Sequence, residues 1–175
     1  MTDSLASLVA AHLHDIPDFP EPGVLFKDFT PLLREHEAFA AVVDDAVHRF
    51  RDAVDYVVGI EARGFMIGAA TAYALGVGFV PVRKEGKLPG ETEAATYDLE
   101  YGTATIEIHT DAFPRGARVL VMDDVLATGG TAAATCDLVE RLGGVVVAVD
   151  VVVELTALGG AGALGGRTLR SLLQV

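Results

Sequence analysis

The spacing of hydrophobic and polar positions predicts strands and helices that alternate along most of the chain. Short apolar runs are typical of buried strands, and apolar residues that recur every three or four positions are typical of one face of a helix. The pattern predicts helices near 4–14, 39–50, 64–75 and 131–142, and strands at 56–60, 77–82, 103–109, 118–122 and 145–153. This alternation favours an α/β fold, with a twisted, mostly parallel central sheet flanked by helices.

Two segments depart from the alternation. Residues 15–35 contain four prolines and Gly23, so we predict a loop there rather than a core element. Residues 83–98 mix lysine, glycine, proline, glutamate and threonine, which predicts a mobile, flexible loop. A chain of 175 residues fits one domain, so we expect residues 1–35 to form a small hood over the sheet within a single domain, 1–175.

The segment Val119–Thr131 has the features of a site for a phosphorylated sugar. Its apolar start predicts a buried strand, and two carboxylates, Asp123 and Asp124, follow at the carboxyl end of that strand. A turn of small residues then leads into a predicted helix, and this turn comprises Ala127, Thr128, Gly129, Gly130 and Thr131. Backbone N–H groups of such a turn and the positive end of the helix bind phosphate. Since carboxylates repel phosphate, Asp123 and Asp124 are expected to face ribose hydroxyls, a bound metal or both.

Other phosphate-binding loops do not fit this segment. A Walker A loop needs a lysine before its Ser or Thr, and no lysine follows Lys87; the dinucleotide fingerprint is also missing from residues 126–131. A solvated Asp-Asp turn that only caps a helix is the alternative interpretation. A second strand-to-helix turn, Gly59–Gly64, carries Arg63 at its crest, either as an anion ligand or as a surface arginine.

Residues 119–131 resemble the 5-phosphoribosyl 1-pyrophosphate (PRPP) motif of the type I phosphoribosyltransferase family. Further stretches that resemble this family, in the same order and over nearly the whole chain, are 18–33, 59–65, 80–90, 97–102 and 153–156. The resemblance is strongest to members that use adenine. It implies the type I phosphoribosyltransferase fold, transfer from PRPP to adenine to give AMP and pyrophosphate in purine salvage, and a homodimer. It also implies Mg²⁺ that is carried by PRPP, with no metal ligand from the protein itself.

The resemblance also implies roles for residues outside the motif. The pyrophosphate-binding residues it implies are Arg63, Arg83 and Lys87, and the adenine-binding residues are Val24, Leu25, Phe26 and Lys27, with Phe26 stacking on the ring. Lys27 stands where the family commonly has arginine, so the charge is kept but the planar fork is lost. Glu100 matches the carboxylate that faces the purine near N7, and a non-proline cis peptide is implied between Glu61 and Ala62. Without the resemblance, these residues would fit a core or a solvated surface.

The composition of the chain excludes some classes of protein. The net charge is −12, from 13 basic and 25 acidic residues, which argues against a nucleic-acid binder. The single cysteine, Cys136, cannot form an internal disulfide. No signal peptide or membrane-spanning segment is recognisable, so we expect a cytoplasmic protein. Two alternatives remain: a phosphoribosyltransferase for xanthine or hypoxanthine, and a PRPP-sensing regulator, which would be expected to carry a basic DNA-binding extension.

Overall fold

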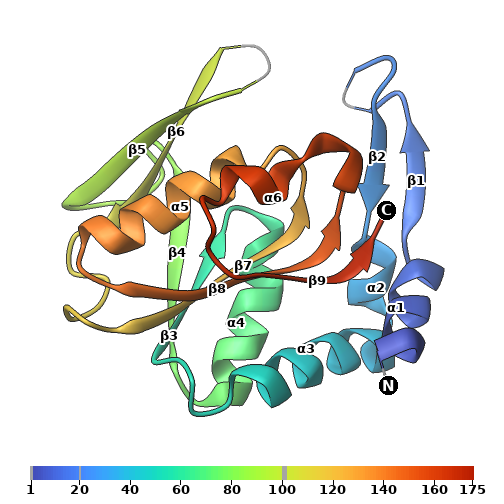
Figure 1. Cartoon of the computed structure of the whole chain (residues 1–175), viewed down its shortest axis with the longest axis horizontal. Helices are drawn as coiled ribbons and strands as arrows, with labels where there is room; N and C mark the ends of the chain where they lie inside the picture. Colours follow the sequence, from blue (N-terminus) through green and yellow to red (C-terminus); the bar gives the residue numbers. More distant parts are fainter. Residues whose placement is uncertain (1, 20, 100–101) are drawn as a thin grey trace.

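The computed structural model describes residues 2–19, 21–99 and 102–175, with side chains from residue 5 onward. Its centre is a seven-stranded sheet with the strand order β5-β6-β4-β3-β7-β8-β9 (Figure 1). The strands are β3 (Tyr56–Ile60), β4 (Gly78–Lys84), β5 (Thr92–Asp98), β6 (Thr103–His109), β7 (Arg118–Leu126), β8 (Val145–Glu154) and β9 (Leu169–Gln174). Pairing is parallel from β4 through β3, β7 and β8 to β9, whereas β6 is antiparallel to β4 and β5. The predicted α/β fold with a mostly parallel sheet is confirmed.

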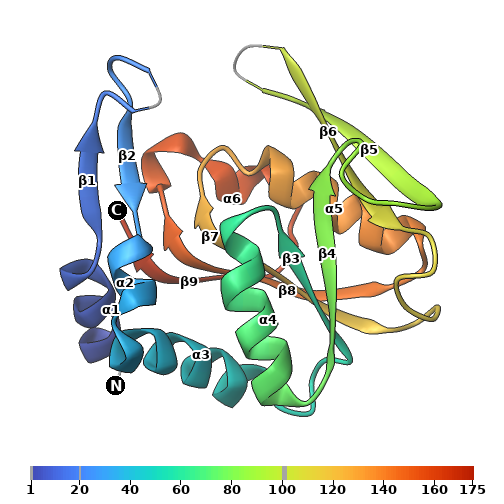
Figure 2. The ribbon, with the colours of Figure 1, turned by 180° about the vertical axis from the view of Figure 1, so that it is seen from behind.

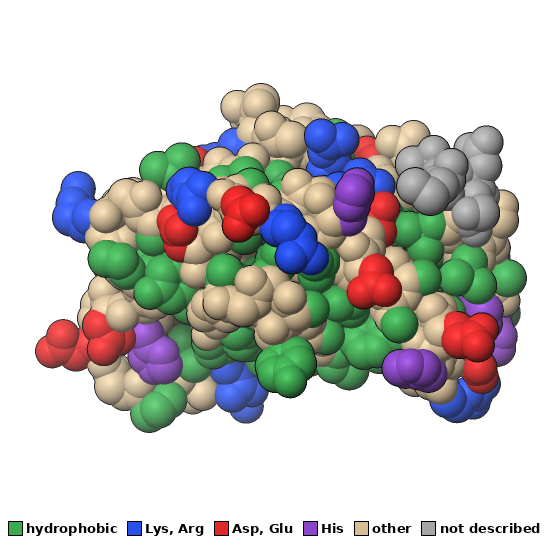
Figure 3. All heavy atoms as spheres, turned by 90° about the horizontal axis from the view of Figure 1, so that it is seen from below, with side chains coloured by type: hydrophobic (Ala, Val, Ile, Leu, Met, Phe, Trp, Pro, Cys, Tyr) green, Lys and Arg blue, Asp and Glu red, His purple; other side chains and the backbone are tan. Residues whose placement is uncertain are grey.

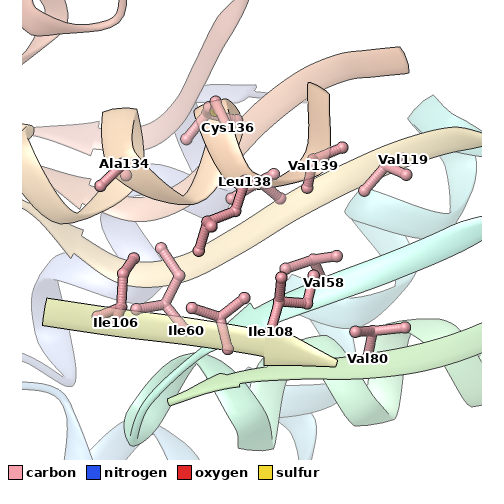
Figure 4. Close-up of a cluster of buried hydrophobic side chains, with 14 of the residues drawn as sticks. Val58, Ile60, Val80, Ile106, Ile108, Val119, Ala134, Cys136, Leu138 and Val139 are labelled. Carbon is pink, nitrogen blue, oxygen red and sulfur yellow. The ribbon is translucent and has the colours of Figure 1, made fainter. Parts of the chain in front are cut away.

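Helix α5 (Gly130–Arg141) covers one face of the sheet. Leu138 and Val139 of this helix pack in one cluster with Val58 of β3 and Val119 of β7, as Figure 4 shows. Alternate residues of a strand point to opposite faces of a sheet. The neighbouring residues of the same strands therefore point to the opposite face of the sheet, where they pack in a second hydrophobic core.

The other core is formed with α3 (His36–Phe50) and α4 (Arg63–Leu75); in Figure 2, α4 lies in front of the sheet and α3 runs along the bottom of the molecule. Here Val57 of β3 and Leu120 of β7 pack with Val42 of α3 and Ile67 of α4. Strands buried on both faces need apolar residues at every position, which is why β3, β7 and β8 were recognisable as continuous apolar runs.

The N-terminal region contains more regular structure than predicted. After α1 (Thr2–Ala11), the segment expected to be a loop forms an antiparallel hairpin of β1 (His14–Pro17) and β2 (Leu25–Asp28), followed by α2 (Thr30–Arg34). The prolines fit because one ends β1 and another lies in the first turn of α2, where its missing N–H is not needed. Phe29 and Leu32 are fully buried. The prediction that residues 15–35 lack a core element is therefore wrong.

The prediction of a loop over residues 83–98 is also wrong for most of that segment. Residues 83–84 complete β4, and 92–98 form β5, which pairs with β6 along its whole length. Because β5 is an edge strand of mostly polar, partly exposed residues, it lacks the apolar run that marks a buried strand. Residues 85–91 form the connection, and movement of this segment stays a prediction.

The C-terminal part adds further elements that the hydrophobic pattern did not predict. A 3₁₀ helix, η1 (Thr156–Leu158), and a short helix, α6 (Gly160–Ala163), lead into β9, the strand at the other edge of the sheet. Five glycines between 159 and 166 obscure the pattern there, since glycine carries no side chain from which a buried face could be recognised.

Both hairpins, β1–β2 and β5–β6, project on the same side of the molecule, beyond the carboxyl ends of the parallel strands (Figures 1 and 2). Ligands of parallel α/β sheets bind at this end. The opposite end, seen in Figure 3, carries basic and acidic side chains interspersed among hydrophobic ones. None of the helices in the described part of the chain combines the length and apolar content needed to cross a bilayer.

Candidate active site

A cavity of about 680 Å³ opens between the hood and the carboxyl ends of β3 and β7. Its walls come from four separate parts of the chain, and they comprise Gly23, Val24, Leu25, Phe26, Lys27, Glu61, Ala62, Arg63, Asp123, Asp124, Val125, Ala127, Leu155 and Leu158. A smaller recess shares three of these residues and continues along the phosphate turn, Thr128 to Thr131. The structure thus brings together the predicted base-binding residues, Arg63, the acidic pair and the turn.

The phosphate turn has the geometry of an anion site. Gly129 is the N-cap of α5 and has φ 82°, in the left-handed region that favours glycine. No side chain caps the amino end of this helix, so its first backbone N–H groups can donate hydrogen bonds to a ligand. The hydroxyl of Thr131 donates a hydrogen bond of 2.8 Å to the hydroxyl of Tyr97. The phosphate-binding role of the turn stays a prediction.

The two carboxylates lie within β7, which continues to Leu126 rather than ending before them as predicted. The backbone N–H of Asp124 donates to Oδ1 of Asp123 at 2.9 Å. Burial, reinforced by the neighbouring carboxylate, raises the pKa of Asp123 well above its usual range. Burial also raises the pKa of Asp124, and the guanidinium of Arg63 opposes that rise.

One oxygen of this pair lacks a hydrogen-bond partner. Oδ2 of Asp124 lies 2.9 Å from Nε of Arg63 as an ion pair, but it accepts no hydrogen bond from any residue that the structure describes. A buried carboxylate oxygen without a donor is unfavourable, so the pair fits a ligand that brings hydroxyl groups or a hydrated cation. Within the described ranges, no cluster of three or more His, Cys, Asp or Glu residues could hold a metal by itself.

Arg63 connects the acidic pair to the hood. Its guanidinium lies 4.8 Å from the ring centroid of Phe26 and 5.6 Å from that of Phe29. The helix that begins at Arg63 can approach β7 closely because the next residue is Gly64, where a Cβ would lie 2.7 Å from the carbonyl oxygen of Met122. The peptide between residues 61 and 62 is cis, as the family resemblance implied.

The hood contributes an apolar wall with partly exposed side chains. Val24 and Leu25 are 43% and 51% exposed, and Phe26 packs edge-on against Phe19 with ring centroids 5.0 Å apart. Apolar groups that stay exposed beside a cavity are suited to cover a flat ring. Lys27 also lines the cavity, but its ammonium group pairs with Asp15 at 2.7 Å across the hairpin.

Arg83 and Lys87 are not among the residues that line the cavity. The guanidinium of Arg83 donates to both carboxylate oxygens of Glu61, each at 3.2 Å, and to the backbone carbonyl of Lys87 at 3.2 Å. The hydrogen bond from Arg83 holds the pKa of Glu61 below its ordinary value. Arg83 is thus bound to Glu61, which itself lines the cavity in the turn that carries Arg63. Glu100 lies outside the described residues.

The structure also identifies site residues that were not predicted. Leu155 and Leu158 also line the cavity, and Tyr97 contacts the phosphate turn. The segment 153–156 carried a family resemblance, which was the available signal for Leu155. The segment 97–102 carried the same kind of signal for Tyr97, although no role was predicted for that residue. No pattern in the sequence indicated Leu158, because its position depends on how η1 packs beside the cavity.

Comparisons with known proteins agree with this geometry. The family model described as "Phosphoribosyl transferase domain" matches residues 31–158. The adenine phosphoribosyltransferase of Acidothermus cellulolyticus is 58% identical over 172 residues, which cover 98% of this chain and 97% of that protein. The one of Salinispora tropica is 59% identical over 171 residues, covering 97% of this chain and 91% of that protein.

Solved structures show the same likeness. The crystal structure of adenine phosphoribosyltransferase from Rhodothermus marinus matches with a TM-score of 0.94 and 47% identity, covering 99% of each chain. The enzyme from Saccharomyces cerevisiae, solved as a complex that contains adenine, matches with a TM-score of 0.93 and 44% identity over 98% of this chain and 99% of that one. The chain therefore belongs to the phosphoribosyl transferase family, in its adenine phosphoribosyltransferase branch.

Proposed function

We propose that this protein transfers the phosphoribosyl group of PRPP to adenine, forming AMP and pyrophosphate in purine salvage. The observation that carries the proposal is the 680 Å³ cavity, because it joins an apolar hood wall to a buried acidic pair at the end of β7. The adjoining phosphate turn completes the site. The apolar wall suits a base, the acidic pair suits the hydroxyls of a ribose, and the turn suits a phosphate, in the order in which these groups are linked in a nucleotide.

The phosphate and ribose positions follow from the residues of the motif. The amino end of α5 and the hydroxyls of Thr128 and Thr131 bind the 5′-phosphate. The carboxylates of Asp123 and Asp124 accept hydrogen bonds from the 2′- and 3′-hydroxyls, which supplies the donors that Oδ2 of Asp124 lacks.

The base lies between the hood and Leu155. Phe26 stacks on the purine ring, and backbone groups near Leu25 read the edge that carries the 6-amino group. Hypoxanthine has an acceptor at that position, so the same backbone groups would be left unpaired. Adenine is therefore the preferred base.

The reaction is a displacement at C1′ through an oxocarbenium-like state. The attacking purine nitrogen forms a bond to C1′ and loses its proton, while the bond from C1′ to pyrophosphate breaks. Glu100 accepts or stabilises that proton, and Arg63, Arg83 and Lys87 stabilise the departing pyrophosphate. The fixed relative positions of base and ribose supply a further part of the rate.

Magnesium fits this site as a companion of the substrate. When bound with PRPP, Mg²⁺ would neutralise negative charge on the pyrophosphate, and Asp123 and Asp124 would face it from the cavity wall. In this proposal PRPP carries the metal, and the protein contributes no direct metal ligand.

We also propose a cytoplasmic homodimer. Helix α4 supports an interface, because Met66 and Tyr73 lie two turns apart on the same side of the helix and are 44% and 90% exposed. Light scattering on the purified protein tests this point. A mass of one chain at micromolar concentration would contradict it.

The test of the proposed function is a steady-state assay with PRPP and each of adenine, hypoxanthine, guanine and xanthine. We expect AMP and pyrophosphate from adenine, and a preference over hypoxanthine of at least about 10²-fold in kcat/KM, because a mismatched edge leaves polar groups unpaired. Equal turnover of hypoxanthine would refute the base assignment. Absence of any nucleotide product, with intact PRPP binding, would favour a PRPP-sensing regulator.

A further inference from the structure

Tyr97 joins the β5–β6 hairpin to the phosphate turn. It lies near the end of β5, where it pairs with Ala104 of β6, and its hydroxyl accepts a hydrogen bond of 2.8 Å from Oγ1 of Thr131. The two residues are 34 positions apart in the sequence. A side chain of the β5–β6 hairpin thus contacts a residue that we assign to phosphate binding.

The ring of Tyr97 is held in place independently of its hydroxyl. It packs, half-buried, against the hydrophobic cluster beneath α5. It also lies against Gly130, where a Cβ would be 3.0 Å from Cδ2 of the ring and 3.5 Å from the carbonyl oxygen of Asp98. Because the ring is already fixed, Tyr97 loses little conformational entropy when its hydroxyl forms a hydrogen bond with Thr131.

The hydroxyl of Thr131 has a single proton, which decides what Tyr97 does when phosphate binds. Without a ligand, Thr131 donates this proton to Tyr97. A phosphate dianion only accepts, so Thr131 must turn its proton to the phosphate. Tyr97 then reverses its role and donates to Oγ1 of Thr131, which keeps that oxygen fixed and strengthens its donation through a chain of hydrogen bonds.

We propose that Tyr97 is a positioning residue for PRPP, which orients Thr131 toward the 5′-phosphate and ties β5 to the occupied turn. The inference rests on the proposed function in needing a phosphate ester in this turn. Glu100 follows Tyr97 by three positions. Occupation of the turn therefore constrains the strand that leads to the proposed catalytic carboxylate.

The test compares Tyr97→Phe, which removes only the hydroxyl, with Thr96→Val. The control removes the hydroxyl pair between Thr96 and Thr105, 2.9 Å apart, on the same hairpin but away from the turn. We expect Tyr97→Phe to raise KM for PRPP about 2- to 12-fold, the value of one hydrogen bond between neutral groups, with KM for adenine unchanged. Thr96→Val should match the wild type. An unchanged KM for PRPP in Tyr97→Phe, or equal changes in both variants, would overturn the inference.

A double-mutant cycle shows whether Tyr97 acts through Thr131. In a Thr131→Val background, Tyr97→Phe should cause no further loss of PRPP affinity. The same loss in both backgrounds would contradict the assigned role. Calorimetry with ribose 5-phosphate repeats the comparison without catalysis: if the wild type binds this ligand more tightly than Tyr97→Phe but makes no AMP, the proposed function fails while the role of Tyr97 stands.

Discussion

Replacing Gly160 by alanine is expected to damage the site from outside the cavity. Gly160 begins α6, and a Cβ there would be closer to the carbonyl oxygen of Ala127 than Cβ atoms come in real structures, and 3.0 Å from the nitrogen of Gly129. Both neighbours are backbone atoms of the phosphate turn, so no side chain can rotate away. To restore a normal separation, the turn and α6 must move apart by about 1 Å.

The magnitude follows from that displacement. A misplacement of about 1 Å in a positioning element costs roughly 10²-fold in catalysis, so kcat/KM for PRPP should fall by about that factor in Gly160→Ala. If the turn moves, KM for PRPP rises most. If α6 moves instead, the wall formed by Leu158 shifts and KM for adenine rises most.

Gly162→Ala is the matched control. It adds the same methyl group to the same short helix, but nothing lies within 4 Å of its Cβ. We expect it to keep full activity and to unfold at the same or a slightly higher temperature, because alanine suits a helix better than glycine. Thermal melts of both variants separate local displacement from unfolding. Gly160→Ala with kcat/KM within about 3-fold of Gly162→Ala would refute the reasoning, since it would show that the contact is relieved without moving the turn.

Two further predictions concern the carboxyl groups of Glu100 and Asp150. Glu100→Gln should keep PRPP affinity but lower kcat by roughly 10²–10⁴-fold, the loss expected for a general base, and near wild-type turnover would remove its catalytic role. Asp150 of β8 is 5% exposed, and burial raises its pKa from 3.8 to about 7. Because the unfolded chain releases this proton at lower pH than the folded one, the wild type should lose about 2 kcal/mol between pH 5 and 7, which Asp150→Asn should not lose. Urea unfolding at several pH values measures this, and identical pH profiles would contradict it.

The local parts of the protein could be predicted from sequence because their causes are local. Strands buried on both faces need continuous apolar runs, so β3, β7 and β8 were recognisable. A phosphate turn works through backbone amides and a helix end, which residues 127–131 specify by themselves. The strands β1, β2, β5 and β9 were missed because they lack a continuous apolar run. They form because a neighbouring strand supplies their hydrogen bonds, and the sequence of the strand alone does not reveal that neighbour.

The partners of the site residues were decided only by the tertiary structure. The charge of Lys27 pairs with Asp15, Arg83 is held by Glu61, and Thr131 meets Tyr97. Each of these pairs joins residues on different elements, so which groups meet depends on strand order and register. Sequence by itself thus determined the fold class and the kinds of chemical group in the site. Chain folding decided which of these groups face the cavity and which neutralise one another, because electrostatic and hydrogen-bond energies depend on distances of a few ångströms between distant segments.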